Sequence, residues 1–102
     1  MTADRFEQGR LLESTIRVPD NVVYREFAQE TVLLNLDTGQ YHGVNPTGGA
    51  FLRTLERAAT VGEAAARLSE QYGRDLEGME TDVCSFCNEL LERGLVTVEE
   101  QP

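Results

Sequence analysis

The feature that most limits the possible folds of this chain is the dipeptide Asn45-Pro46, where the sequence pattern changes. Before it, from Val22 to Val44, strand-forming residues are dense and are interrupted by short turn sequences. After it, apolar residues recur at helical spacing up to Gly94. Asn is a favoured N-cap and Pro is tolerated at the first helical position, so a helix is expected to begin here. Strands followed by helices predict an α+β domain.

Three short strands are expected before Asn45-Pro46. Gly39 can adopt the positive φ that a tight hairpin needs, so the strands should follow one another as an antiparallel meander. The expected strands are Val22–Phe27, Thr31–Leu36 and Gln40–Val44. A further extended piece, Thr15–Val18, precedes Pro19, and the sequence does not assign its pairing.

Three helices and a short terminal strand are expected after Asn45-Pro46. Thr60 and Glu63 have the spacing of a capping box, and Gly73 and Gly94 are suitable helix ends. The expected helices run from Pro46 to about Arg57, from Val61 to Tyr72 and from Asp75 to Gly94, and Leu95–Val98 is expected as the strand. The predicted fold is therefore winged helix-turn-helix-like, with a three-stranded antiparallel meander, three helices and a short terminal strand.

The length and composition fit a single small folded domain. The chain has 102 residues, of which 40% are hydrophobic and 26% charged. We expect the domain over residues 15–98, a flexible N-terminal arm over residues 1–14 and a frayed C-terminus over residues 99–102. The first ten residues lack the apolar core of a secretion signal, and no apolar run approaches the ~18 residues needed to cross a bilayer. The sequence therefore predicts a cytoplasmic protein with no membrane partner.

The charge balance argues against nucleic acid as a partner. Asp and Glu number 18 against 9 Lys and Arg, which gives a formal net charge of -9. A winged helix-turn-helix would place its third helix in the DNA major groove, but here that helix carries, after its expected cap Asp75, five acidic residues against Arg93 alone. The acidic residues are Glu77, Glu80, Asp82, Glu89 and Glu92. Because phosphate contacts come from cations, we expect no nucleic-acid binding. An acidic winged-helix regulator acting through protein or DNA contacts remains an alternative function.

The pair Cys84 and Cys87 has the spacing of a redox or metal motif. Reactive pairs of this kind lie at helix starts, whereas these two fall in the middle of the third helix among apolar neighbours that raise a thiol pKa. A zinc site needs four ligands, and His42 is the only histidine. We therefore interpret both cysteines as small hydrophobic residues of the core or of a groove, and expect no catalysis, metal or cofactor. A thiol enzyme is the remaining alternative.

The run from Val32 to Asn45, a hairpin that leads directly into a capped helix, resembles the PqqD-like family of small peptide-recognition domains. The likeness continues to the segment Arg93-Gly94-Leu95-Val96 and covers about Val22 to Val98. The resemblance implies a RiPP recognition element, a non-enzymatic domain that binds the leader segment of a ribosomally made precursor peptide and presents it to a processing enzyme. The sequence departs from the common family pattern at Cys84 and Cys87.

The hairpin Asp37-x-Gly39-x-Tyr41 resembles the stand-alone members of lasso-peptide clusters more than the quinone-cofactor members. That resemblance implies two partners, the leader region of a lasso-peptide precursor and a separate leader peptidase of the cysteine-protease type. A PqqD-type peptide chaperone for a radical enzyme is the alternative within the family.

The third expected strand offers a physical basis for leader binding. It is short and carries no Lys, Pro or inward charge that would block its free edge, so a disordered leader could add a strand there. Alternate leader side chains would then enter the groove between this strand and the third helix. The expected peptide-binding residues are Gln40, Tyr41, His42, Gly43 and Val44 on the strand, with Val83, Cys84, Cys87 and Leu91 on the helix.

Overall fold

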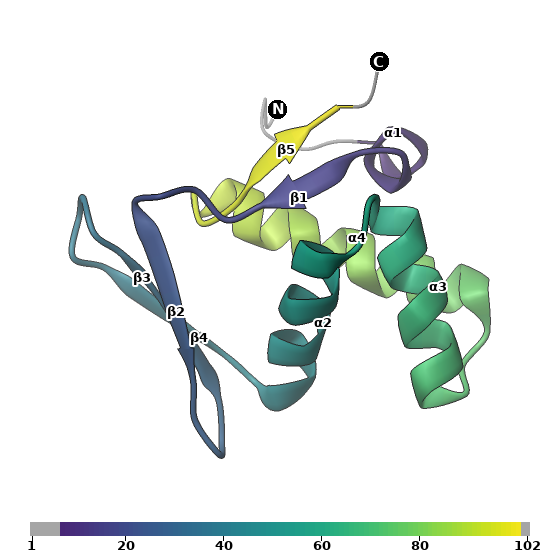
Figure 1. The fold of residues 1–102 in the computed structure, drawn as a ribbon, viewed down its shortest axis with the longest axis horizontal. Coiled ribbons are helices and arrows are strands. Elements are labelled where there is room, and N and C mark those ends of the chain that lie inside the picture. The colour runs from purple at the N-terminus through teal and green to yellow at the C-terminus, as the bar shows by residue number, and fades with distance from the viewer. Residues whose placement is uncertain (1–6, 101–102) are drawn as a thin grey trace.

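A computed structural model describes residues 7–100 of the chain (Figure 1). The elements in chain order are α1 (Gln8–Leu12), β1 (Thr15–Arg17), β2 (Val22–Glu26), β3 (Thr31–Asn35), β4 (Tyr41–Val44), α2 (Pro46–Arg57), α3 (Val61–Tyr72), α4 (Leu76–Glu92) and β5 (Thr97–Glu99). This arrangement confirms the predicted α+β fold, with a meander, three longer helices and a terminal strand.

The meander forms an antiparallel sheet with the strand order β2-β3-β4. Figure 1 shows this sheet standing to one side of the helices, with the end of β4 leading into α2. Gly39 has a φ of 76°, as the hairpin between β3 and β4 requires. The Asn35 amide donates to the Gln40 carbonyl at 2.9 Å, which closes that hairpin. Among the described strands, β4 therefore lies at an edge of the sheet.

The pairing that the sequence left open is between β1 and β5, which form a separate two-stranded antiparallel sheet. Ile16 lies opposite Val98 and is 2% exposed. The terminal strand lies slightly later than expected because Leu95 and Val96 are buried in the core before pairing begins. In the described part of the chain, β1 thus pairs away from β4 and leaves the edge of that strand uncovered.

The N-terminal helix α1 corrects the expectation of a flexible arm over residues 1–14. Leu11 is fully buried, and α1 packs against α3 and α4. The Val61 amide donates to the Ser14 carbonyl at 2.8 Å, which joins this segment to the start of α3. Residues 8–14 therefore belong to the domain, because Leu11 supplies part of its core. Residues 1–6 lie outside the described residues, as do residues 101–102 of the expected frayed end, whereas Glu99 is part of β5.

The three longer helices begin at the caps that the sequence predicts. Each cap side chain accepts a hydrogen bond from a first-turn amide: Asn45 from Gly48 at 2.8 Å, Thr60 from Glu63 at 3.1 Å, and Asp75 from Gly78 at 2.8 Å. No helix of residues 7–100 has the length and apolar character needed to span a bilayer.

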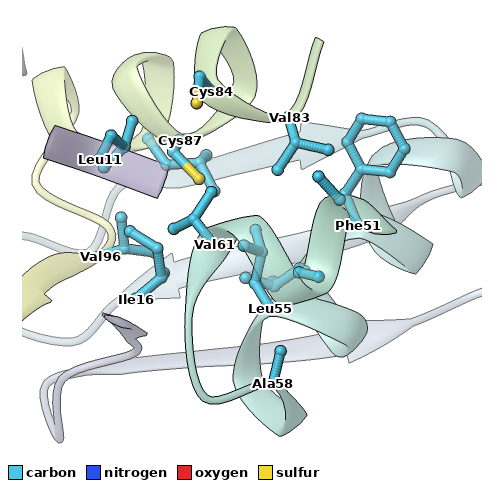
Figure 2. Packing of buried hydrophobic residues seen from close by; sticks show 14 of the residues in the cluster. Leu11, Ile16, Phe51, Leu55, Ala58, Val61, Val83, Cys84, Cys87 and Val96 are labelled. Carbon is cyan, nitrogen blue, oxygen red and sulfur yellow. The ribbon is translucent and has the colours of Figure 1, made fainter. Parts of the chain in front are cut away.

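A single hydrophobic core joins the helices to one face of the sheet and to the β1–β5 pair. Figure 2 shows part of this cluster, in which side chains from α1, β1, α2, α3 and α4 converge. Its fully buried members include Leu11, Leu33, Leu52, Val61, Leu68, Val83, Cys87 and Leu90. One face of α4 packs against this core, and this packing places another face of the same helix beside β4.

Candidate functional site: the free edge of β4

The backbone of β4 presents hydrogen-bonding groups on the side opposite β3. Residues in an antiparallel pair alternate between positions that bond to the partner strand and positions that do not. The bond from the Asn35 amide to the Gln40 carbonyl shows that these two residues form a hydrogen-bonded pair. By the strand register, the next hydrogen-bonded pairs are Leu33 with His42 and Thr31 with Val44. The intervening residues Tyr41 and Gly43 therefore direct their N–H and C=O groups away from β3. No strand of residues 7–100 lies on that side.

The side chains of β4 alternate between the two faces of the sheet. His42 and Val44 are half-buried and face the helices, on the same side as the buried residues Leu33 and Thr31 of β3. Tyr41 and Gly43 face outward, and Tyr41 is 77% exposed. A strand added at this edge would therefore have one row of side chains facing α4 and the other row facing solvent.

Two pockets follow one another along the helix-facing side of β4. The first, of about 260 Å³, is lined by His42, Gly43, Val44, Asn45, Gly48, Phe86 and Glu89. The second, of about 290 Å³, is lined by Asn35, Gln40, Tyr41, His42, Glu92, Arg93 and Leu95. His42 borders both. Together they form a groove between the edge of β4 and α4.

Phe86 is the apolar floor of the first pocket. Its ring packs edge-to-face on Phe51, with centroids 5.6 Å apart and planes at 90°, which fixes it beside the edge of β4. Gly48 leaves the space in front of it open, since a Cβ at this position would lie 3.1 Å from Phe86 Cε1. The pocket can therefore accept an apolar side chain.

The structure corrects the expectation that Val83, Cys84 and Cys87 line this groove. All three are buried in the core, with exposures of 0%, 3% and 0%, and Figure 2 shows Val83 and Cys87 directed into the cluster. Leu91 is half-buried against the core and lines neither pocket. The physical reason is that the most apolar stripe of α4 packs against α1 and α3 in the core, so a neighbouring stripe faces β4.

The groove residues that the sequence reasoning missed on α4 are Phe86, Glu89 and Glu92. Phe86 and Glu89 lie three residues apart and share one helical stripe with Arg93. One aromatic residue within an otherwise polar stripe is a signal for a partly covered surface, and this signal could have identified them. The five strand residues, Gln40 to Val44, do come together along the groove.

Burial makes both thiols poor nucleophiles. It raises the pKa of Cys84 to about 11, with a smaller contribution from the Glu80 carboxylate. Burial also raises the pKa of Cys87, and the neighbouring Cys84 adds to the shift. Both cysteines are free, and within residues 7–100 no group of three His, Cys, Asp or Glu side chains could hold a metal ion. Because thiolate is the reactive form, the arrangement suits packing rather than chemistry.

The fold and the site define a class of protein: a small α+β domain whose three-stranded sheet keeps one edge free beside a helix. Comparison with known protein families identifies the family within this class. The family described as "Coenzyme PQQ synthesis protein D (PqqD)" matches residues 30–96, and the chain belongs to this family. The resemblance seen in the sequence is thereby confirmed. No match was found among curated proteins.

Solved structures with the same fold include two complexes with peptides. "TbiB1 in Complex with the TbiA(beta) Leader Peptide" is 29% identical with a TM-score of 0.71, covering 78% of this chain and 93% of the other. "Lasso peptide synthetase B1 complexed with the leader peptide" is 21% identical with a TM-score of 0.73, covering 80% and 96%. The PqqD truncation of Methylobacterium extorquens PqqCD, a stand-alone RiPP recognition element, is 20% identical with a TM-score of 0.65, covering 80% and 87%.

Proposed function

We propose that this domain is a non-catalytic adaptor that binds the leader segment of a ribosomally synthesised precursor peptide by strand addition to β4. The observation that carries the proposal is the free edge itself, where Tyr41 and Gly43 direct main-chain groups away from β3 beside a pocket floored by Phe86. Two solved structures with this fold are complexes with leader peptides, which supports the proposal.

Leader side chains that lie opposite His42 and Val44 would face α4 and enter the two pockets. The edge offers four main-chain groups, which contribute about 1 kcal/mol each when bonded. Two buried apolar side chains would add about 2 kcal/mol each. Ordering the leader costs about 2–5 kcal/mol, which leaves about 3–6 kcal/mol before electrostatic steering and further contacts add to it. We therefore expect binding nearer the micromolar than the picomolar range.

The precursor that we propose is of the lasso-peptide class, and the second partner is a separate leader peptidase of the cysteine-protease type. The shared fold with the lasso peptide synthetase B1 that was solved with its leader peptide supports the lasso class. A separate peptidase is needed because both cysteines of this chain are buried and have raised pKa values. The domain would then hold the leader while another chain cuts it.

The test uses a substitution that blocks the edge without disturbing the sheet. Tyr41→Pro removes an N–H that points away from β3, a position where an edge strand tolerates Pro. Tyr41→Ala is the matched control, since it removes the exposed ring and keeps the N–H. The probes are fluorescein-labelled leader segments of any short precursor peptides found encoded beside the gene, with the TbiA(beta) leader peptide as a reference.

We expect saturable anisotropy changes with the unaltered protein, at least roughly tenfold weaker binding for Tyr41→Pro, and a change of less than about threefold for Tyr41→Ala. Circular dichroism should show both variants folded. The proposal is overturned if no leader saturates at tens of micromolar protein, or if Tyr41→Pro binds as tightly as the unaltered chain.

A further inference from the structure

The side chain of Glu30 lies over the outer face of the edge strand. Glu30 ends the turn between β2 and β3, where its carbonyl accepts a hydrogen bond from the Phe27 amide at 2.7 Å. The next residue, Thr31, pairs with Val44, so Glu30 is held beside the last residues of β4. Its exposed carboxylate makes no hydrogen bond or ion pair with any residue of the described range 7–100.

The glycine at position 43 leaves room for this carboxylate. A Cβ added to Gly43 would lie 2.5 Å from Glu30 Oε1. Gly43 lies in regular strand and is not among the glycines with positive φ, so its backbone does not itself require glycine. What the missing side chain provides is space on the outer face, and Glu30 fills it.

An added strand would bring one of its side chains to this carboxylate. The residue directly opposite Gly43 would point to the same outer face, with its Cβ about 4.5–5.5 Å from the position of a Gly43 Cβ. Glu30 Oε1 would then lie within roughly 8 Å of that incoming Cβ. A Lys or Arg side chain spans this gap, whereas an acidic side chain would be repelled.

The charges around this position favour an incoming cation. Gly43 of β4 lies opposite Val32 of β3, which lies opposite Arg25 of β2. Among these three residues the only cation, Arg25, is therefore on the strand farthest from the free edge of β4. The chain as a whole carries a net charge of -9, which attracts a basic peptide from a distance. We propose that Glu30 is a specificity-determining residue that selects leader peptides with Lys or Arg at the position pairing with Gly43. This inference rests on the proposed strand addition to β4.

The experiment is a reciprocal charge reversal. Each Lys and Arg of a leader that saturates the unaltered protein is replaced singly by Glu, and every peptide is titrated against the unaltered protein, Glu30→Gln and Glu30→Lys. Glu30→Gln should bind the natural leader roughly three- to fivefold more weakly, the effect of an exposed ion pair. Glu30→Lys should weaken it roughly tenfold, and one Glu-substituted leader should regain affinity with this variant only.

Glu70→Gln is the matched control, because Glu70 is an exposed acidic residue of α3, an element that does not line the groove. It should leave every affinity within about 1.5-fold if the effect is local. The inference is overturned if the bound leader has no cation whose reversal is rescued by Glu30→Lys, or if Glu30→Gln binds the natural leader unchanged. A complete failure of all leaders to bind the unaltered protein would instead contradict the proposed function.

Discussion

His42 Nε2 lies 3.4 Å from Glu89 Oε2, and this contact joins the edge strand β4 to helix α4 between the two pockets of the groove. Glu89 is also 3.8 Å from Arg93 Nε. The His42 side chain is 22% exposed and that of Glu89 is 52% exposed, so solvent reaches the pair. Contacts of this kind position side chains more than they stabilise a fold.

We therefore expect His42→Ala and Glu89→Gln to lower leader affinity while changing stability little. A double-mutant cycle in urea unfolding should give a coupling energy of no more than about 1 kcal/mol, because exposed pairs are screened by water. A coupling above about 2 kcal/mol would show that the pair is buried more completely than the structure indicates.

Two adjacent glycines of α2 should separate binding from folding. Gly48→Ala places a Cβ 3.1 Å from both Phe86 Cε1 and Val44 Cβ, so it fills the first pocket and should weaken leader binding roughly tenfold. Gly49→Ala instead directs its Cβ at the buried Thr31 side chain, 3.2 Å from Thr31 Cβ, and should destabilise the domain by about 1–3 kcal/mol. Anisotropy titration and thermal unfolding distinguish the two effects. Equal behaviour of both variants in both assays would contradict this assignment.

Stability should fall in alkaline solution. Burial raises the pKa of Cys84 from its ordinary 9.0 to about 11, so the folded state favours the protonated thiol. That contribution is present below pH 9 and is lost as the pH rises towards 11, by at most about 3 kcal/mol. The free energy of unfolding, measured by denaturation at pH 8 and at pH 10.5, should therefore fall less for Cys84→Ala than for the unaltered chain.

Tyr24 provides the control for the alkaline titration. Burial and a hydrogen bond to Glu56 raise its pKa to about 12, so its contribution is lost only above pH 10. Tyr24→Phe should therefore leave the decline between pH 9 and pH 10 in place. An equal pH dependence of the unaltered chain and Cys84→Ala would argue that Cys84 is solvated.

The helix α1 should prove essential to the domain. Leu11→Ala removes a fully buried side chain and should lower the free energy of unfolding by about 2–5 kcal/mol. Leu36→Ala, at a position that is 55% exposed, should change it by less than about 0.5 kcal/mol. Chemical denaturation of the two variants gives the comparison. If Leu11→Ala is as stable as Leu36→Ala, α1 is not part of the folded core.

Local sequence signals determined the three strands of the meander and the three longer helices of this protein. Asn45, Thr60 and Asp75 cap helices through contacts with residues three positions away, and Gly39 turns the hairpin through its own backbone. Such features depend on near neighbours, so they can be read from the chain. The order of the strands, and with it the free edge of β4, followed from the short connections between them.

Only the tertiary structure decided which face of α4 meets the groove. Val83 and Cys87 are as apolar as a groove floor requires, and the sequence alone could not separate them from Phe86. Their burial depends on where α1, α2 and α3 pack, which is a property of the whole core. The position of Glu30 over Gly43 depends in the same way on strand register. Long-range packing and pairing place these residues, and neither is encoded in local spacing.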